Sequence, residues 1–291
     1  MNREDPGLRW KVRRFTAPLA EDLSGPRNGA ASVRWLGQAG FLIEGGGVRV
    51  VVDPYLSNSL EAKYRGRGMP HERMFPAPVS PAALGYVDLV LCTHAHTDHM
   101  DPDTLRPLAR RLAGLRVVVP AASLSIAESR TGLTAPRLIG VDAGETHSLC
   151  DDRLKLHVFR AAHETLDCDA QGRHHFLGFG LDIGGRRIFH SGDTIPYLGQ
   201  REEITAFMPD LALLPVNGRH DALRKCGIAG NLTLEEAMAL TGDCGIPAMV
   251  PHHYGMFAFN TVDPVQVAEA AARAPFQMIP AQYQQAIEAT T

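Results

Sequence analysis

The feature that most constrains this chain is a cluster of polar residues that follows a short apolar segment. Residues 87–91 (Val-Asp-Leu-Val-Leu) predict a buried strand, and the sequence His94-Ala95-His96-Thr97-Asp98-His99 comes shortly after it. Asp101-Pro102 then has the pattern of a helix N-cap followed by proline in the first turn. We therefore expect the polar side chains on a turn between a strand and a helix.

Three histidines and an aspartate lie within this turn, namely His94, His96, Asp98 and His99. Imidazole nitrogens and carboxylate oxygens are ligands that zinc, manganese and iron all accept in proteins. A single His-x-His pair is a weak signal, but four such side chains crowded together have little structural purpose without a cation. The turn therefore predicts a metal site.

The composition is that of a globular protein that can bury a core, with 45% hydrophobic and 21% charged residues. A formal net charge of −3 without a basic block argues against a nucleic-acid partner. No apolar run approaches the roughly 20 residues of a transmembrane segment, and the N-terminal residues lack the apolar region of a signal peptide. Five scattered cysteines without a Cys-x-x-Cys pair argue against disulfides and a thiolate zinc site. We expect a cytoplasmic protein. Whether it forms a homo-oligomer stays open at the level of the sequence.

Segments of strand and helix character alternate along the chain, which is typical of a layered α/β protein. Strands are expected at residues 33–36, 41–43, 48–52, 87–91, 116–120, 154–158, 176–183, 186–190, 211–216, 248–251 and 276–279. Helices are expected at residues 104–112, 121–130, 233–240 and 263–273. Residues 1–30 are rich in charge, proline and glycine, so we expect an N-terminal arm before a single domain at residues 31–291.

Residues of ligand type recur where the expected strands end, because Asp53, His163, Asp193 and His253 all occupy such places. Strand ends at one edge of a sheet converge, and α/β proteins keep their sites there. Asp53 has two interpretations, a hydrogen-bonding support for the histidine turn or a simple turn former.

The stretch from residue 55 to 84 predicts a long irregular loop with a basic cluster of Lys63, Arg65 and Arg67. These cations could meet a phosphate or carboxylate on a substrate, or they could simply be solvated. Both interpretations stay open at the level of the sequence.

The histidine turn also resembles a known family. Thr93–His99 matches the His-x-His-x-Asp-His signature of metallo-β-lactamase-fold hydrolases. Residues 35–40 (Trp-Leu-Gly-Gln-Ala-Gly), 190–193 (His-Ser-Gly-Asp) and 251–255 (Pro-His-His-Tyr-Gly) resemble the L-ascorbate-6-phosphate lactonase-like group within it. The resemblance implies an α/β fold in which two β-sheets are flanked by helices, an αββα sandwich with the site along one sheet edge.

The same resemblance implies a two-metal ligand set. His94, His96 and His163 would hold one divalent ion, and Asp98, His99 and His253 the other. Asp193 would bridge the two ions. Side chains alternate along an extended segment, so only one of His252 and His253 is expected to face the metals. The family pattern of histidine, aromatic residue and glycine matches His253, which leaves His252 as a pocket residue.

The function that this resemblance implies is hydrolysis of a small ester or lactone, sugar-derived, by a metal-bridging hydroxide. Zinc or manganese would serve as the two metal ions, with iron as a third candidate. The expected catalytic residues are Asp98, which would orient the nucleophile, and His252 and Tyr254, for proton delivery. The expected residues for contact with the small-molecule substrate are Tyr55, Asn217 and Arg219.

Two alternative functions stay open. Residues 253–257 (His-Tyr-Gly-Met-Phe) also resemble N-acyl-phosphatidylethanolamine phospholipase D, which implies a phosphodiesterase. An iron-binding redox protein on the same fold is the second alternative, and the intact set of three histidines counts against it. The segment Ala162-His163-Glu164 fills a ligand position that the ascorbate-phosphate lactonases do not clearly show, so the exact substrate of that group does not transfer.

Overall fold

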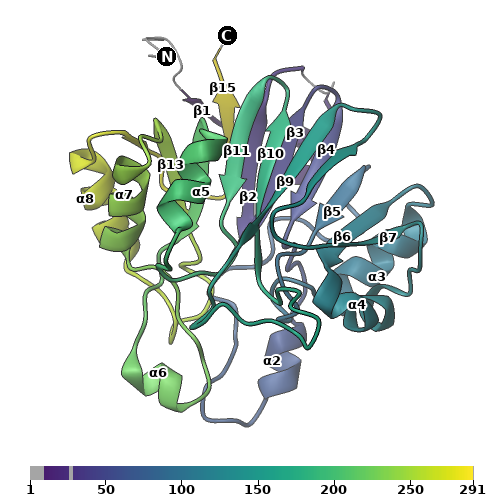
Figure 1. Cartoon of the computed structure of the whole chain (residues 1–291), viewed down its shortest axis with the longest axis horizontal. Coiled ribbons are helices and arrows are strands. Elements are labelled where there is room, and N and C mark those ends of the chain that lie inside the picture. The colour runs from purple at the N-terminus through teal and green to yellow at the C-terminus, as the bar shows by residue number, and fades with distance from the viewer. Residues whose placement is uncertain (1–9, 26–28, 291) are drawn as a thin grey trace.

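Two mixed β-sheets pack face to face in the computed structural model, which describes residues 10–25 and 29–290, and helices cover the outer faces (Figure 1). The larger sheet has eight strands in the order β1 (Trp10–Arg14), β15 (Gln285–Ala289), β2 (Ser32–Gly37), β3 (Gly40–Gly45), β4 (Val48–Val52), β5 (Leu89–Leu91), β6 (Arg116–Pro120) and β7 (Leu138–Val141). The second sheet has seven, in the order β14 (Gln277–Met278), β13 (Ala248–His252), β12 (Leu211–Pro215), β11 (Arg186–His190), β10 (Leu177–Ile183), β9 (Leu154–Arg160) and β8 (Thr146–Leu149). The predicted αββα sandwich of the metallo-β-lactamase fold is confirmed.

The described helices are α1 (Leu19–Asp22), α2 (Ser59–Tyr64), α3 (Pro102–Arg111), α4 (Leu124–Thr131), α5 (Gln200–Phe207), α6 (Asp221–Lys225), α7 (Leu234–Asp243) and α8 (Pro264–Arg273). Helix α4 packs on β6 and β7 of the larger sheet, and α7 packs on β12 and β13 of the second. The expected N-caps are present, since Asp101 accepts a hydrogen bond from the Asp103 amide and Thr233 forms a capping box with Glu236. No helix in the described part of the chain has both the length and the apolar character needed to span a membrane.

Side chains of β3 alternate between two apolar cores because successive residues of a strand face opposite sides of a sheet. Phe41 and Ile43 point into the core between the sheets, which they share with Phe179. Leu42 belongs to the second core, between the larger sheet and α3, together with Leu105. Removing such a side chain from water stabilises the fold by about 1.5–3 kcal/mol. Strands buried on both faces form a rigid frame, and their ends position the site.

The N-terminal segment differs from the expected arm. Residues 10–14 form β1, which pairs with β15 at the edge of the larger sheet, and Trp10 is buried. The sequence did not predict this strand because it is short and three of its five residues are charged, as is common in edge strands. Residues 1–9 and 26–28 of the expected arm lie outside the described residues. The described part of the segment therefore belongs to the sandwich itself.

Asp22 fastens this segment to the sheet, and its loss is expected to destabilise the protein. Arg13 and Arg34 each donate a hydrogen bond of 2.7 Å to the Asp22 carboxylate. Burial acts to raise the pKa of Asp22, but these two hydrogen bonds outweigh it and hold the pKa below its ordinary value. A depressed pKa stabilises the folded state at neutral pH, and this contribution is lost as the pH falls through the folded-state pKa.

We therefore expect Asp22→Asn to lower the free energy of unfolding at pH 7 by about 1–3 kcal/mol, as removal of a charged hydrogen-bond partner does. The difference from the wild type should shrink in acid, because protonation removes the same charge from Asp22. Urea denaturation across this pH range measures both effects. Asp151→Asn, at a side chain that is 94% exposed, is the matched control and should change little. Equal stability of Asp22→Asn and the wild type at pH 7 would contradict this role.

Candidate metal centre

The histidine turn joins β5 to α3 and is held by hydrogen bonds within its own backbone. The amides of His99 and Met100 both donate to the carbonyl oxygen of His96. At the end of the turn, Asp101 caps α3 and also accepts a hydrogen bond of 2.8 Å from the Ser59 hydroxyl. The turn is therefore anchored to the helix on one side and to β5 on the other.

The remaining candidate ligands lie just beyond the ends of other strands. His163 follows β9, Asp193 follows β11 and His253 follows β13. Since β11, β12 and β13 run parallel, their carboxyl ends meet at one edge of the second sheet. Gly192 has a φ of +63°, and a Cβ there would lie 2.3 Å from the Leu177 carbonyl oxygen, so only glycine fits directly before Asp193.

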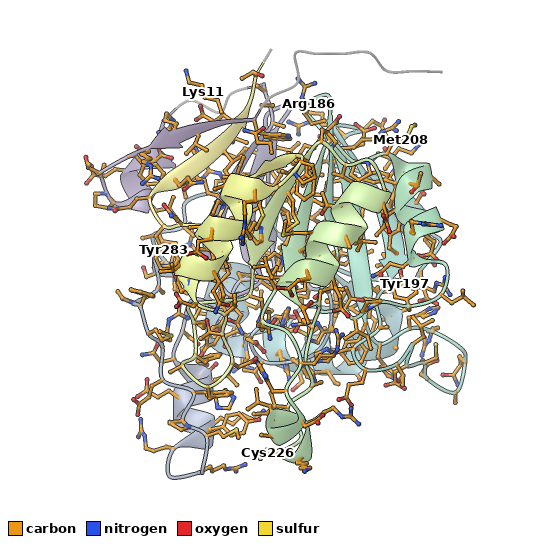
Figure 2. The ribbon with its side chains drawn as sticks, turned by 90° about the vertical axis from the view of Figure 1, so that its left-hand side faces the viewer. Lys11, Arg186, Tyr197, Met208, Cys226 and Tyr283 are labelled. Atoms are coloured by element: carbon orange, nitrogen blue, oxygen red, sulfur yellow. The ribbon has the colours of Figure 1, made fainter. Side chains whose placement is uncertain are left out.

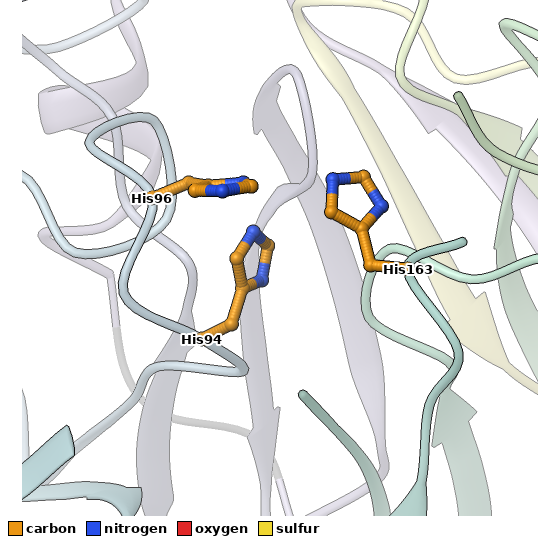
Figure 3. A group of neighbouring side chains, drawn as sticks. All are labelled: His94, His96 and His163. Carbon is orange, nitrogen blue, oxygen red and sulfur yellow. The ribbon is translucent and has the colours of Figure 1, made fainter. Parts of the chain in front are cut away.

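The structure brings all seven predicted ligands together. His94, His96 and His163 each offer one atom within 4.8 Å of the others, and their rings point toward one another from two segments (Figure 3). The same criterion joins Asp98, His99 and His253 in a second group. The Oδ2 atom of Asp193 lies 3.3 Å from Nε2 of both His99 and His253, and Asp193 also groups with His94. Asp193 therefore lies where the two groups meet.

Several nitrogen and oxygen atoms that could bind a metal in these groups are buried, and they have no hydrogen-bond partner among the described residues. They are Nε2 of His94 and His99, both ring nitrogens of His253, Nδ1 of His163 and Oδ1 of Asp193. A buried polar atom without a partner costs about 1–3 kcal/mol, so six at one place need an explanation. Bound divalent cations would supply partners for such atoms, because imidazole with carboxylate is a suitable ligand set for a borderline divalent metal.

The protonation states of most of these side chains suit metal ligation. Burial lowers the pKa of His94 well below its ordinary value, and burial lowers that of His163 to about 4, so both rings are neutral at pH 7. Burial acts to raise the pKa of Asp193, but His253 and His99 outweigh it and hold the pKa well below its ordinary value. His99 differs, since Asp193, Asp53 and Asp98 overcome the effect of burial and raise its pKa well above the ordinary value.

Asp53 supports the turn, which decides between its two interpretations. Its carboxylate is fully buried and accepts hydrogen bonds from the Thr93 amide at 2.7 Å and the Thr93 hydroxyl at 2.6 Å. Its Oδ2 atom also lies 2.7 Å from Nδ1 of His99. A hydrogen bond from Nδ1 leaves Nε2 of His99 to face the cluster, which is how a carboxylate orients a metal-ligating histidine.

Gln38 is a functional residue that we did not predict, because its partner lies 60 positions away. Its side-chain amide donates a hydrogen bond of 3.0 Å to Oδ2 of Asp98. Its backbone carbonyl oxygen accepts from the His253 amide at 3.1 Å. Gln38 therefore holds two candidate ligands of the same group. Its signals in the sequence were the tight turn between the strands at 33–36 and 41–43 and its place in the stretch at residues 35–40 that carries the family resemblance.

Arg130 is a second residue that sequence reasoning missed. Its Nη1 atom donates to the carbonyl oxygens of Ala95 at 2.6 Å and Met100 at 3.0 Å, near the two ends of the histidine turn. One guanidinium therefore ties both ends of the turn to α4. Its position inside an expected helix carried no sign of this contact.

We expect Arg130→Gln to weaken metal binding by about 10- to 100-fold, the usual cost of removing an outer partner that orients ligands. Glutamine is too short to reach both carbonyl oxygens, so the turn loses its brace while every ligand remains. Competition with a chromophoric chelator measures the metal affinity. The control is Arg106→Gln, an exposed arginine of α3 that contacts the Ser129 carbonyl oxygen. Unchanged affinity in Arg130→Gln would show that the turn needs no brace.

A cavity of about 270 Å³ opens onto the candidate ligands. It is lined by five of them (His96, Asp98, His163, Asp193 and His253), by Gln38 and Arg130, and by residues of α2 and the segment after α6. Helices α2 and α6 project from one end of the sandwich (Figure 1), and Cys226 marks the outer end of the α6 segment (Figure 2). The loop at residues 55–84 therefore contributes to the site through a short helix.

His252 and Tyr254, which were expected to deliver protons, do not line this cavity. The His252 ring is fully buried between His190, at 5.1 Å, and Phe41, also at 5.1 Å, on the core side of β13. The Tyr254 hydroxyl donates to the Ala281 carbonyl oxygen. His253, which follows β13 with a φ of +63°, is the residue of this segment between positions 252 and 254 that lines the cavity.

The three expected substrate contacts also lie outside the cavity lining. Arg219 forms an ion pair with Glu236 and lines a different hollow. Asn217 is buried and donates to Asn260, whose own side chain reaches the cavity. Tyr55 is fully buried, and its hydroxyl accepts from the Leu60 amide. Each of these polar groups has its hydrogen-bond or ion-pair partner within the protein.

Comparisons with known proteins agree with this geometry. A family model described as "Beta-lactamase superfamily domain" matches residues 48–254. A UPF0173 metal-dependent hydrolase of Aeropyrum pernix is 29% identical over 244 residues, which cover 80% of this chain and 86% of that protein. A protein of the same name from Myxococcus xanthus is 28% identical over 254 residues, which cover 85% of this chain and 77% of that protein.

A solved structure, that of the metallo hydrolase Igni18 from Ignicoccus hospitalis, has the same fold, with a TM-score of 0.63 at 22% identity. The match covers 87% of this chain and 96% of that one. The family model spans most of this chain and includes every candidate ligand from His94 to His253. The chain therefore belongs to the metallo-β-lactamase superfamily of metal-dependent hydrolases.

Proposed function

We propose that this protein hydrolyses a small ester or lactone with the help of two divalent cations, zinc or manganese. The observation that carries the proposal is the pair of ligand groups that meet at Asp193 on the floor of a small cavity. His94, His96 and His163 would hold one ion, Asp98, His99 and His253 the other, and Asp193 both. Such a pair supplies a nucleophilic water at neutral pH and polarises the attacked oxygen.

The side chains of the protein supply position and charge. Gln38 donates to Oδ2 of Asp98, so the Asp98 carboxylate has a fixed direction at the cavity wall. Its pKa is lowered, since His99 and His253 outweigh the opposing effect of burial, and it is ionised at pH 7. An ionised and oriented carboxylate can accept a proton from the attacking water and hold it for the leaving group.

The size of the cavity favours an ester or lactone over the phosphodiester of a two-chain lipid. At about 270 Å³ it is smaller than the roughly 300–1,000 Å³ of sites that take drug-sized ligands. A compact lactone ring fits within such a volume, whereas a two-chain lipid would extend beyond it. A sugar lactone, as the lactonase-like resemblance implies, is one substrate of this size.

A substrate panel on metal-loaded protein tests the proposal. The substrates are glucono-δ-lactone, δ-valerolactone, phenyl acetate and bis(p-nitrophenyl) phosphate, with zinc or manganese added to chelator-treated protein. We expect metal-dependent turnover of a lactone or ester and little turnover of the phosphodiester. Elemental analysis should give two ions per chain, and an optical spectrum reports any iron. Preference for the phosphodiester, or activity without metal, would refute the proposal.

A further inference from the structure

One part of the cavity lining is an aromatic wall, in which four rings contact one another. The rings of Tyr64 and His71 stack with centroids 4.0 Å apart and an angle of 17°. His71 in turn contacts the edges of Phe257 at 5.2 Å and Phe259 at 4.8 Å, and those two rings lie 5.9 Å apart at 10°. All four residues line the cavity.

His71 belongs to this wall as a neutral ring. Burial lowers its pKa below the ordinary value, and its Nδ1 atom lies 3.0 Å from the Met69 carbonyl oxygen. An uncharged imidazole stacked on a phenol adds aromatic surface to the cavity lining and no charge. The wall therefore suits a flat, apolar group on the substrate.

Lys63 adds a positive charge at the edge of this wall. It lines the cavity, and its ammonium group lies 5.2 Å from the centroid of the Tyr64 ring. Within residues 10–25 and 29–290 it forms no ion pair with a carboxylate. The carboxylates that line the cavity, Asp98 and Asp193, both belong to the candidate metal centre.

The other cation of the lining is already occupied, because Arg130 donates to the carbonyl oxygens of the histidine turn. Lys63 is thus the cavity cation that is available to an incoming anion. Its flexible side chain and strong hydration suit a carboxylate at an open mouth better than a buried pair.

We propose that the cavity selects small esters or lactones whose non-reacting part is a planar ring that carries an anionic group. The ring would lie against Tyr64 and His71, and the anion beside Lys63. This inference rests on the proposed hydrolysis, because it concerns the substrate of the same centre. It assigns to α2 and to the turn after β13 a role in recognition that their sequences alone left open.

Two substrate pairs separate the contributions of ring and anion. Of the first pair, meta-carboxyphenyl acetate carries an anionic group that phenyl acetate lacks. Of the second pair, dihydrocoumarin carries an aromatic ring that δ-valerolactone lacks. Each variant is compared with the wild type on the same substrate, so that differences in intrinsic reactivity cancel. We expect Lys63→Gln to lower kcat/KM for meta-carboxyphenyl acetate roughly fivefold, because one partly exposed ion pair is lost. The kcat/KM for phenyl acetate should change little. High salt should produce the same loss in the wild type.

Tyr64→Leu tests the ring. We expect this variant to lower kcat/KM for dihydrocoumarin about fivefold, which corresponds to the energy of one aromatic contact. The kcat/KM for δ-valerolactone should change little. The matched control is Arg65→Gln, which removes the same charge from the same segment at a side chain outside the cavity lining. The inference would be overturned if Lys63→Gln and Arg65→Gln changed kcat/KM for meta-carboxyphenyl acetate equally. It would also be overturned if Tyr64→Leu lowered kcat/KM equally for both lactones.

A binding measurement separates this inference from the proposed hydrolysis. Calorimetry of benzoate and benzamide against metal-loaded protein needs no turnover. We expect benzoate to bind more tightly than benzamide, and to lose about fivefold in affinity in Lys63→Gln. If no ester is hydrolysed but this pattern holds, the proposed function fails and the recognition site stands. If esters are hydrolysed and benzoate binds Lys63→Gln as tightly as the wild type, the recognition site fails alone.

Discussion

Asp98→Ala is expected to fold as the wild type does and to lose hydrolysis, with kcat lower by about 10²- to 10⁴-fold. The Asp98 side chain is 18% exposed at the wall of the cavity, and its described hydrogen bond is to Gln38. Its loss therefore disturbs no strand or helix, while it removes both a candidate ligand and the carboxylate that orients the nucleophile. His96→Ala, in the other ligand group, should have a similar effect.

Steady-state kinetics at saturating metal, with circular dichroism as a check on folding, measures this effect. Asp103→Asn is the control, since Asp103 is an exposed carboxylate of the following helix that lies outside the cavity. A kcat within a factor of about 10 of the wild type in a folded Asp98→Ala protein would remove Asp98 from the mechanism.

Asp53→Asn should have the second largest effect, on metal affinity rather than on chemistry. The Asp53 carboxylate accepts from the amide and hydroxyl of Thr93 and lies 2.7 Å from Nδ1 of His99. Asparagine replaces one acceptor oxygen by an NH₂ group, which meets a donor at one of these contacts. If that contact is His99, its Nδ1 must become the acceptor, and the proton moves to the Nε2 atom that faces the cluster.

We therefore expect Asp53→Asn to lower metal affinity by about 10- to 100-fold, with activity restored by excess metal. Added metal should not restore Asp98→Ala, and this contrast separates orientation of a ligand from loss of one. Thr93→Ser is the control, because it keeps the hydroxyl that donates to Asp53 and lies 3.0 Å from Nδ1 of His94, and it keeps the contact between Asp53 and His99. Wild-type metal affinity in Asp53→Asn would show that this contact does not determine the orientation of the His99 ring.

The fold was predictable where local sequence and tertiary structure agree. Strands β2, β3 and β4 form a meander whose apolar residues and glycine turns are visible in the sequence, and α7 has a complete capping box. Strands β1, β7, β8 and β15 were missed. Strands β1, β8 and β15 carry polar or charged residues, and β1 and β15 are stabilised by pairing with distant segments. Strand β7 is apolar but only four residues long, and it pairs with β6 across an intervening helix. Trp10 pairs with Ala289, almost the full length of the chain away.

The sequence by itself determined the chemistry of the centre. The spacing of His94, His96, Asp98 and His99 is a local property of one turn, so the ligand types could be read without a structure. Alternation implied that only one of His252 and His253 faces the metals, and the resemblance to the family pattern pointed to His253, which joins the second ligand group. Such inferences succeed because the geometry of a few consecutive residues depends on the backbone alone.

Only the tertiary structure decided what surrounds that centre. Gln38 reaches Asp98 across 60 positions, Arg130 braces the histidine turn from another helix, and Tyr64 and Phe257 form one wall from distant segments. Tyr254 and Arg219, polar residues that follow strands β13 and β12, point elsewhere. Proximity in the sequence sets what a turn can bind, but packing between sheets and loops sets which side chains meet it.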